Sequence, residues 1–195
     1  MSAPIITFNE NLVTRGVKIV IQDISFPNII AHQEEGTTST LVDDVSEDTL
    51  LFFLNYIFRY PSFLEGQFET IKRTLQGKDS VVLLPTSGGK SLAFQLASLV
   101  SVGVTIIIDP TTALIEDQID NLFRIGIDRV VGITSMVERS LKPKLMESFA
   151  KGEYIFCYIA PQRLQIQQFR DKIVALTTST PISIIAIDEA HCVSE

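Results

Sequence analysis

Two short stretches of this 195-residue sequence carry side chains suited to phosphate chemistry. The first follows an apolar run and consists of Pro85, Thr86, Ser87, Gly88, Gly89, Lys90 and Ser91. In such a glycine-bearing turn, backbone N–H groups can surround phosphate oxygens, the lysine supplies a positive charge to the β- and γ-phosphates, and the serine hydroxyl can hold Mg²⁺. A helix that starts at the lysine would add its positive N-terminal dipole. We therefore interpret this stretch as a phosphate-binding loop.

The second stretch, residues 184–191, is an apolar strand that is expected to be buried and that ends in two carboxylates, Asp188 and Glu189. A carboxylate at a strand tip can hold Mg²⁺ through its water shell, and its neighbour can polarise the water that attacks a phosphate. We assign Asp188 to the metal and Glu189 to the water. The alternative is that both acids merely cap a helix.

The phosphate loop has its own alternative, an ordinary turn between a strand and a helix. The strict loop pattern has a glycine where Leu84 stands, so the pattern match is imperfect. The presence of the paired carboxylates in the same chain favours the phosphate-binding interpretation.

The elements that must position these stretches alternate regularly between strand and helix from Tyr60 onward. Continuous Val and Ile strands that alternate with helices indicate an α/β fold, a three-layer sandwich around a mainly parallel sheet. Sites in such sheets lie at the carboxyl ends of strands, where both stretches fall. Strands are expected at 80–84, 104–108, 129–133, 154–159 and 183–187, and helices at 65–76, 90–100, 112–125, 141–151 and 163–176.

Residues 1–57 are expected to form an N-terminal extension of unknown role, ahead of a domain that covers 58–195. Within the extension, Ser46 is the expected cap of a helix over 48–58. The other features of the extension are apolar runs expected to form strands at 5–8 and 17–24, a polar loop at 32–40 and a solvated acidic stretch at 43–48.

The composition, with 46% hydrophobic and 20% charged residues, is that of a globular protein. The longest apolar runs are too short to span a bilayer and the N-terminus lacks the pattern of a signal peptide, so we expect a cytoplasmic protein, or a nuclear one in a eukaryote, with no membrane partner. Cys157 and Cys192 belong to no Cys/His cluster and are expected to be reduced thiols.

The net charge of −7 is unevenly distributed along the chain. Residues 1–60 hold 8 acidic and 3 basic residues, a net charge of −5, which leaves 15 acidic and 13 basic residues, a net charge of −2, for the remainder. Because a nearly neutral domain can still present a positive groove, the composition does not exclude a nucleic-acid partner.

The sequence resembles the first RecA-like lobe of superfamily 2 helicases, most closely the RecQ group of ATP-dependent DNA helicases. The resemblance covers residues 58–195, and the Cys-Val-Ser-Glu continuation after Asp188-Glu189-Ala190-His191 is its most specific part. The stretches that are similar to helicase motifs I, Ia, Ib and II are 85–96, 109–118, 158–164 and 188–195, and residues 58–67 resemble the family's adenine-reading motif.

This resemblance implies that the site binds ATP and Mg²⁺ and that the partner of the complete protein is DNA, at a junction of single and double strands. It implies that Gln67 reads the adenine edge, that Tyr60 stacks on the base, and that His191 couples hydrolysis to DNA contact. Movement along DNA in the 3′-to-5′ direction is the corresponding expectation.

The chain departs from the family pattern at four positions. Leu64 stands where the family usually has an Arg that sandwiches the base, and Ser87, Gln162 and Asp109 replace a common Gly, a usual Glu and a small hydroxyl residue.

In the family, motif III and a second lobe with an arginine finger follow the residues that this sequence contains. The motif III strand lies between the motif I and motif II strands, so we expect a gap in the sheet, poor stability and no unwinding by this polypeptide alone. One alternative is a non-catalytic nucleotide- or nucleic-acid-binding module, or a split motor whose second lobe a partner chain supplies. A weaker alternative is a P-loop kinase or a transporter ATPase.

Overall fold

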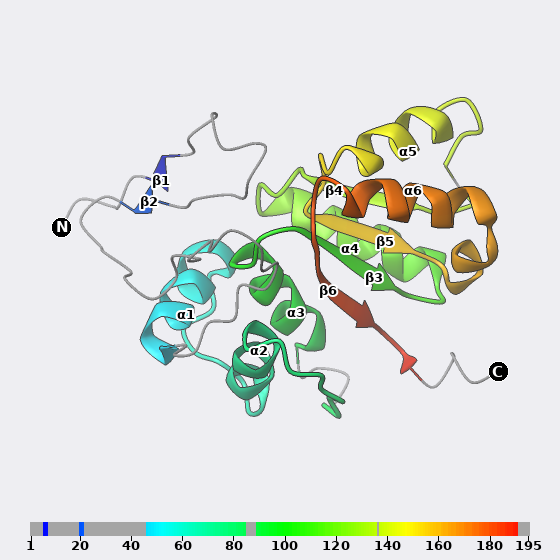
Figure 1. Cartoon of the computed structure of the whole chain (residues 1–195). Coiled ribbons are helices and arrows are strands. Elements are labelled where there is room, and N and C mark those ends of the chain that lie inside the picture. Colours follow the sequence, from blue (N-terminus) through cyan, green and yellow to red (C-terminus); the bar gives the residue numbers. More distant parts are fainter. Residues whose placement is uncertain (1–5, 8–19, 22–45, 85–88, 136, 191–195) are drawn as a thin grey trace. The chain divides into compact units, whose positions relative to one another are not determined.

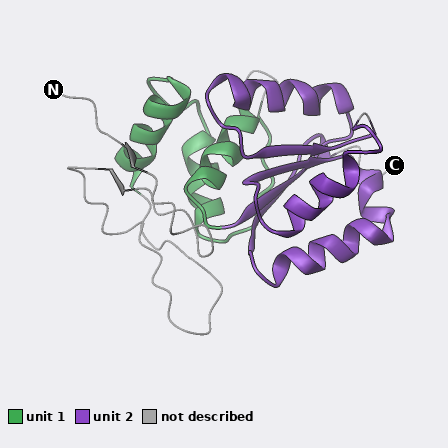
Figure 2. Ribbon diagram, turned by 90° about the horizontal axis from the view of Figure 1, so that it is seen from above, with its two compact units in different colours: residues 1–102 green, residues 103–195 purple. Residues whose placement is uncertain are grey.

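The computed structural model of the whole chain describes residues 6–7, 20–21, 46–84, 89–135 and 137–190 (Figure 1). The chain divides into two compact units, residues 1–102 and 103–195, which Figure 2 colours separately. This division differs from the expected domain boundary between residues 57 and 58, which stays a prediction. None of the helices in the described ranges is long and apolar enough to cross a membrane.

The first unit combines a short strand pair with helical segments. The antiparallel pair lies within the two apolar runs that predicted strands, and Ser46 is the N-cap residue of the first helix, although its side chain makes no capping hydrogen bond. The expected helix over 48–58 is an α-helix that continues as one turn of π-helix. The elements of this unit are β1 (Ile6–Thr7), β2 (Val20–Ile21), α1 (Glu47–Phe53), η2 (Leu54–Phe58), α2 (Gln67–Leu75) and α3 (Lys90–Leu99).

The predicted strand at 80–84 is wrong, because the structure assigns no strand to these residues. Val81 and Leu83 are instead 91% and 92% exposed. A strand needs a neighbour that pairs its backbone N–H and C=O groups, and neither sheet formed by the described residues includes 80–84. The apolar sequence of this segment is therefore not sufficient to make it a strand.

The second unit is built on a four-stranded sheet in which all neighbours are parallel, in the order β4-β5-β3-β6. The α/β class and the parallel sheet are thus confirmed, and each expected element of this unit is present within four residues of its predicted bounds. The elements are β3 (Val104–Ile108), α4 (Thr112–Arg124), β4 (Val130–Ile133), α5 (Lys142–Ala150), β5 (Phe156–Ile159), the 3₁₀-helix η3 (Pro161–Gln165), α6 (Gln167–Thr177) and β6 (Ile182–Ile187).

Side chains alternate between the two faces of this sheet, so each face packs against different helices. On one face, Val104, Ile106 and Cys157 form a core with Phe149 of α5 and Phe169 of α6. Figure 1 labels these two helices and the strands of the sheet. The two phenyl rings stack with centroids 5.8 Å apart, and burial of one such side chain contributes about 1.5–3 kcal/mol.

The opposite face of the sheet packs against α4. At Gly132 of β4, a Cβ atom would come within 2.7 Å of Ile119 and 3.4 Å of Ile115, both of α4. Helices on both faces make this unit a three-layer sandwich. Cys157 is buried and free, as expected, whereas Cys192 lies outside the described residues.

The strands of the described sheet differ in exposure. β3 and β5 are buried along their whole length. In β6, Ile185 and Ile187 are 60% and 48% exposed, which corrects the expectation that this strand is buried. Residues two apart in a strand share one face of the sheet, so it is one face of β6 that stays partly in solvent.

Candidate nucleotide-binding site

The helix that the phosphate-loop interpretation requires is α3, which begins at Lys90 as expected. Its N-cap, Gly89, has the left-handed conformation (φ 65°, ψ 38°) that a residue without Cβ adopts readily. Lys90 and Ser91 therefore lie in the first turn, where the backbone N–H groups are directed out of the helix start and the helix dipole favours an anion. The remaining loop residues, Pro85, Thr86, Ser87 and Gly88, lie outside the described residues, and their phosphate contacts stay a prediction.

The buried face of α3 fixes this first turn in place. Leu96 and Ala97 have no exposed surface, and Ala93 is only 1% exposed. These positions follow the helical spacing of three and four residues, and they pack α3 against its neighbour α2. The start of the helix is thus held by the hydrophobic core of the first unit.

Gln67, the expected adenine reader, is the first residue of α2 and is only 3% exposed. Its Nε2 donates a hydrogen bond to the backbone oxygen of Gly89 (3.1 Å), and its Oε1 accepts one from the backbone N–H of Leu64 (2.8 Å). Gly66, with φ 80°, makes the tight turn between Leu64 and α2. The structure thus brings Gln67 to the residue before Lys90, a contact across 22 positions that the sequence analysis did not find.

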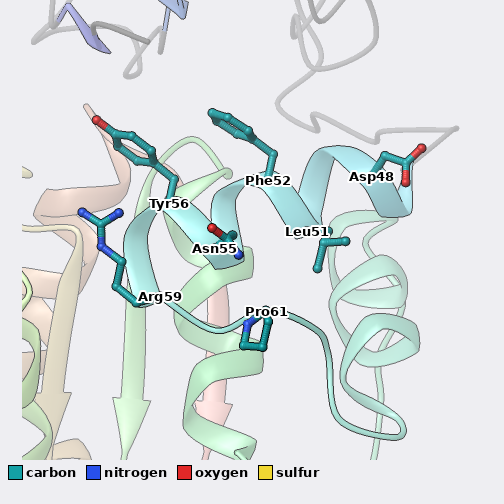
Figure 3. Close-up of a pocket in the computed structure, with 7 residues that line it drawn as sticks. All are labelled: Asp48, Leu51, Phe52, Asn55, Tyr56, Arg59 and Pro61. Carbon is teal, nitrogen blue, oxygen red and sulfur yellow. The ribbon is translucent and has the colours of Figure 1, made fainter. Parts of the chain in front are cut away.

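Tyr60, the expected stacking residue, is 55% exposed and lies in the connection between η2 and α2. Its neighbours Arg59 and Pro61 line a hollow of about 380 Å³ beside α1 and η2 (Figure 3). There Tyr56 stacks on Phe52, with ring centroids 5.8 Å apart. The Arg59 guanidinium lies 5.5 Å from the Tyr56 ring centre. Gln67, Gly89 and Lys90 are not among the described residues that line the hollow, so the contact between Gln67 and Gly89 is separate from it.

In the second unit, Asp188 and Glu189 follow β6 directly at the carboxyl end of the sheet, as predicted. The Asp188 N–H donates to the backbone oxygen of Ile108 (2.9 Å), and the Glu189 N–H donates to Asp188 Oδ1 (3.0 Å). Glu189 has a left-handed backbone with φ 49°, a conformation that costs a residue with a Cβ about 1–2 kcal/mol. The next expected site residue, His191, lies outside the described residues.

Asp109 is a third carboxylate at this edge of the sheet. Ile108 of β3 is in register with Ile187 of β6, which places Asp109 beside Asp188. The side chain is buried, with 1% of the residue exposed, and its Oδ1 accepts the Thr111 N–H (2.8 Å) at the start of α4.

Burial is the main cause that raises the Asp109 pKa above its ordinary value, and the charges of Asp188 and Glu189 raise it further, while the Thr111 N–H opposes the shift. In the sequence, Asp109 stands out only as the first residue of the stretch similar to motif Ia and as a departure from the family pattern there. One signal in the sequence could have identified Asp109 as a residue near the site. It follows a strand that was expected to lie in the same sheet as the strand before Asp188.

Arg163 joins two further loops at the carboxyl ends of the strands. Its Nε donates to the backbone oxygen of Ile133 (3.0 Å) and its Nη2 to that of Thr134 (2.7 Å). One side chain of η3 therefore holds the end of β4. The sequence placed Arg163 in a motif-like stretch but did not show this role.

The expected site residues thus fall into two groups. Gln67, Gly89, Lys90 and Ser91 belong to the first unit, and the carboxylates belong to the second. Within the described ranges, no group of three or more His, Cys, Asp or Glu side chains could hold a metal ion.

Comparison with known proteins identifies the class. Residues 65–195, which are 131 of the 195 residues, match the model of the DEAD/DEAH box helicase family. The chain therefore belongs to the DEAD/DEAH box helicase family.

Curated relatives narrow the resemblance to the RecQ group, as expected. The chain is 38% identical over 142 residues to a probable ATP-dependent DNA helicase RecS from Bacillus subtilis, and the aligned region covers 73% of this chain and 27% of the relative. It is 36% identical over 152 residues to an ATP-dependent DNA helicase RecQ from Pasteurella multocida (76% and 23%). It is 31% identical over 189 residues to an ATP-dependent DNA helicase Q-like 5 from Arabidopsis thaliana (92% and 20%). The chain thus spans a fifth to about a quarter of the length of these relatives.

Proposed function

We propose that this chain forms part of the ATP-binding lobe of an ATP-dependent DNA helicase of RecQ type, in which ATP hydrolysis drives the unwinding of DNA. The observation that carries the proposal is that two features occur in the part of the chain that matches the helicase family model. A helix begins at Lys90, directly after its N-cap Gly89, and a parallel strand ends at Ile187, directly before Asp188 and Glu189.

The donor chemistry of these residues fits a magnesium nucleotide. The Ser91 hydroxyl and the Asp188 carboxylate are hard oxygen donors of the kind that Mg²⁺ takes, and the first turn of α3 suits a phosphate. When bound, Mg²⁺ would neutralise negative charge on the phosphate oxygens. In this proposal Ser91 and Asp188 hold the ion, Lys90 binds the β- and γ-phosphates and Glu189 orients the attacking water.

Other roles follow from the resemblance to the RecQ group. The backbone of residues 85–89 surrounds the phosphates, Tyr60 stacks on the base, and His191 couples hydrolysis to DNA contact. The three relatives are named DNA helicases, which supports DNA as the partner. Movement in the 3′-to-5′ direction is what the resemblance to the RecQ group implies.

Substitution of Lys90 tests the nucleotide site. Because Lys90 supplies the positive charge for the phosphates, Lys90→Ala is expected to abolish binding of Mg·ATP, measured by isothermal titration calorimetry. Lys78→Ala is the matched control in the same unit, since Lys78 is exposed and its Nζ contacts only Gln76 among the described side chains. Unchanged ATP affinity in Lys90→Ala would remove the assignment.

DNA dependence separates the helicase proposal from the non-catalytic alternative. ATP turnover that rises when single-stranded DNA is added supports a motor, whereas ATP binding without turnover, with or without DNA, supports a module that another polypeptide completes. A phosphate-release assay measures the turnover, and isothermal titration calorimetry of the same protein measures the binding.

A further inference from the structure

The charged side chains of the second unit are divided between the two faces of its sheet. On one face, α5 and α6 lie side by side (Figure 1). Residues 138–151 and 167–177, which we call the α5–α6 face, hold six basic and three acidic residues, a net charge of +3. On the opposite face, α4 holds three acidic residues and one arginine, a net charge of −2. A chain with a net charge of −7 therefore carries a positive surface on one face of this unit.

The charges of the α5–α6 face are directed into solvent. Phe149 of α5 and Phe169 and Leu176 of α6 are buried in the core of the unit. The two helices thus bury their apolar sides and present their polar sides outward. The six basic residues of the α5–α6 face are exposed or partly exposed: Arg139, Lys142, Lys144, Lys151, Arg170 and Lys172.

Several of these positive charges have no carboxylate partner. Lys142 and Lys144 form no ion pair and no hydrogen bond with any residue that the structure describes. Arg170 donates to neutral groups, the backbone oxygen of Leu164 (2.9 Å) and the side-chain oxygen of Gln167 (2.6 Å). Neutral oxygens leave the charge of a guanidinium in place.

One carboxylate is shared between the two helices. Glu147 Oε1 of α5 lies 2.8 Å from Lys151 Nζ. The hydrogen bond and the charge of Lys151, and to a smaller extent the charge of Lys172 on α6, lower the pKa of Glu147. A single negative charge is thus set against two lysines, so it cancels only one of the two positive charges.

We propose that the α5–α6 face binds the phosphate backbone of nucleic acid through its lysines and arginines, outside the candidate nucleotide site and without reading the base sequence. The proposal rests on the proposed function for its choice of partner, because DNA is the substrate of that function. Contacts to phosphates fix the position of a protein on nucleic acid and carry no sequence information. The α5–α6 face would therefore hold DNA on the second unit whatever its sequence.

The spread of the basic residues suits a polyanion. Lys144 and Lys151 are seven residues apart, which is about 10 Å along the helix at 1.5 Å per residue. This separation is too large for one phosphate ion to contact both lysines. A strand of nucleic acid instead presents a phosphate about every 3.4 Å along the duplex axis. The α5–α6 face therefore matches a chain of phosphates.

The salt dependence of DNA binding tests the proposal. Fluorescence anisotropy of a labelled DNA duplex of mixed sequence, titrated with the full chain at several salt concentrations, measures the binding constant. Each phosphate contact contributes about 0.9 to the slope of its logarithm against the logarithm of the salt concentration. Lys142→Gln, Lys144→Gln and Lys172→Gln together are expected to make this slope shallower by about 2–3 and to weaken binding at low salt by about tenfold or more.

The matched control removes three positive charges away from this face. Lys72→Gln on α2, Lys78→Gln after it and Arg124→Gln on α4 together change the net charge by the same amount. We expect this variant to keep the wild-type slope, because exposed charges more than about 10 Å apart are largely screened at 0.1 M salt. Equal losses in the two triple variants would overturn the proposal, since net charge alone would then explain them.

A single substitution tests the same face in the opposite direction. Glu147→Gln removes the carboxylate that Lys151 and Lys172 share, so it is expected to tighten DNA binding by about threefold or more at low salt and to steepen the slope by about 1. Glu116→Gln removes the same charge from α4 and is expected to leave the slope unchanged. Unfolding cannot produce a gain in affinity. Equal effects of the two substitutions would contradict the proposal.

Competition and ATP binding separate the remaining outcomes. Displacement of the duplex by poly-L-glutamate or by phosphatidylserine vesicles as readily as by unlabelled DNA, at equal charge concentration, would overturn nucleic acid as the partner. Mg·ATP binding, measured by calorimetry, is expected to be the same in the wild type and in both triple variants. A wild-type chain that binds Mg·ATP but no DNA would overturn this inference alone, whereas a chain that binds no Mg·ATP would overturn the proposed nucleotide site.

Discussion

Removal of the Arg163 side chain should loosen the carboxyl-end loops of the second unit. The guanidinium donates to two backbone oxygens at the end of β4, at 3.0 and 2.7 Å, from a position about 30 residues further along the chain. Hydrogen bonds from a charged donor contribute about 1.5–3 kcal/mol each when buried. Because Arg163 is only partly buried, we expect Arg163→Ala to lower the free energy of unfolding by about 2 kcal/mol in total.

Urea denaturation followed by circular dichroism measures this loss. With a slope of about 2 kcal/mol per molar urea, the transition midpoint should fall by about 1 M. Arg163→Lys keeps the charge but lacks the planar fork, so it should retain one of the two bonds and lose about half as much.

Arg124→Ala is the matched control for this experiment. Arg124 is exposed, and its Nη1 bonds only the Asn121 side chain one turn away on α4 (3.1 Å), so its loss should stay below about 0.5 kcal/mol. An Arg163→Ala midpoint as close to wild type as that of Arg124→Ala, or equal losses for alanine and lysine at position 163, would refute the bridging role.

Two further predictions concern the ends of β3. The raised pKa of Asp109 means that its proton favours the folded state, so its stabilising contribution is complete below the ordinary carboxyl pKa and is lost as pH rises through the folded pKa. Asp109→Asn keeps an oxygen that can accept the Thr111 N–H, so the variant should be more stable than wild type at pH 7. In urea titrations with EDTA, this difference in the free energy of unfolding should shrink toward pH 4. A difference that stays constant with pH would contradict the prediction. Gly103 and Gly126 both have positive φ, but only at Gly103 would a new Cβ meet a backbone oxygen, at 2.3 Å. Gly103→Ala should therefore lower the free energy of unfolding by several kcal/mol, and Gly126→Ala by about 1 kcal/mol. Similar thermal shifts for the two glycine variants would contradict the role of that contact.

Local sequence patterns predicted most elements of the second unit. β3 has the predicted bounds, and the continuous apolar runs at β5 and β6 also form strands. This succeeds because parallel strands of a covered sheet need apolar residues on both faces, a pattern that is visible in the residues themselves. The start of α3 at Lys90 was equally readable, since a helix follows the Gly-Lys-Ser pattern of a phosphate-binding turn.

The same reasoning failed where a segment depends on a partner. Residues 80–84 are as apolar as β3, yet no described strand pairs with them and they are not a strand. Likewise, the isoleucines of β6 looked like buried residues, but Ile185 and Ile187 share a face of the strand that is left partly exposed. Strand pairing and the covering of a face are properties of the assembled sheet rather than of the segment.

The sequence by itself determined the chemistry that this chain can offer, a Gly-Lys-Ser turn before a helix and an Asp-Glu pair after a strand, together with the α/β class and the resemblance to helicases. Only the tertiary structure decided which of these groups meet. Gln67 reaches Gly89 across 22 positions, Asp109 lies beside Asp188, and Arg163 reaches the end of β4. Such contacts depend on strand register and helix packing. The spacing of residues along the sequence does not encode register or packing, because both arise only when distant segments share one sheet or one core.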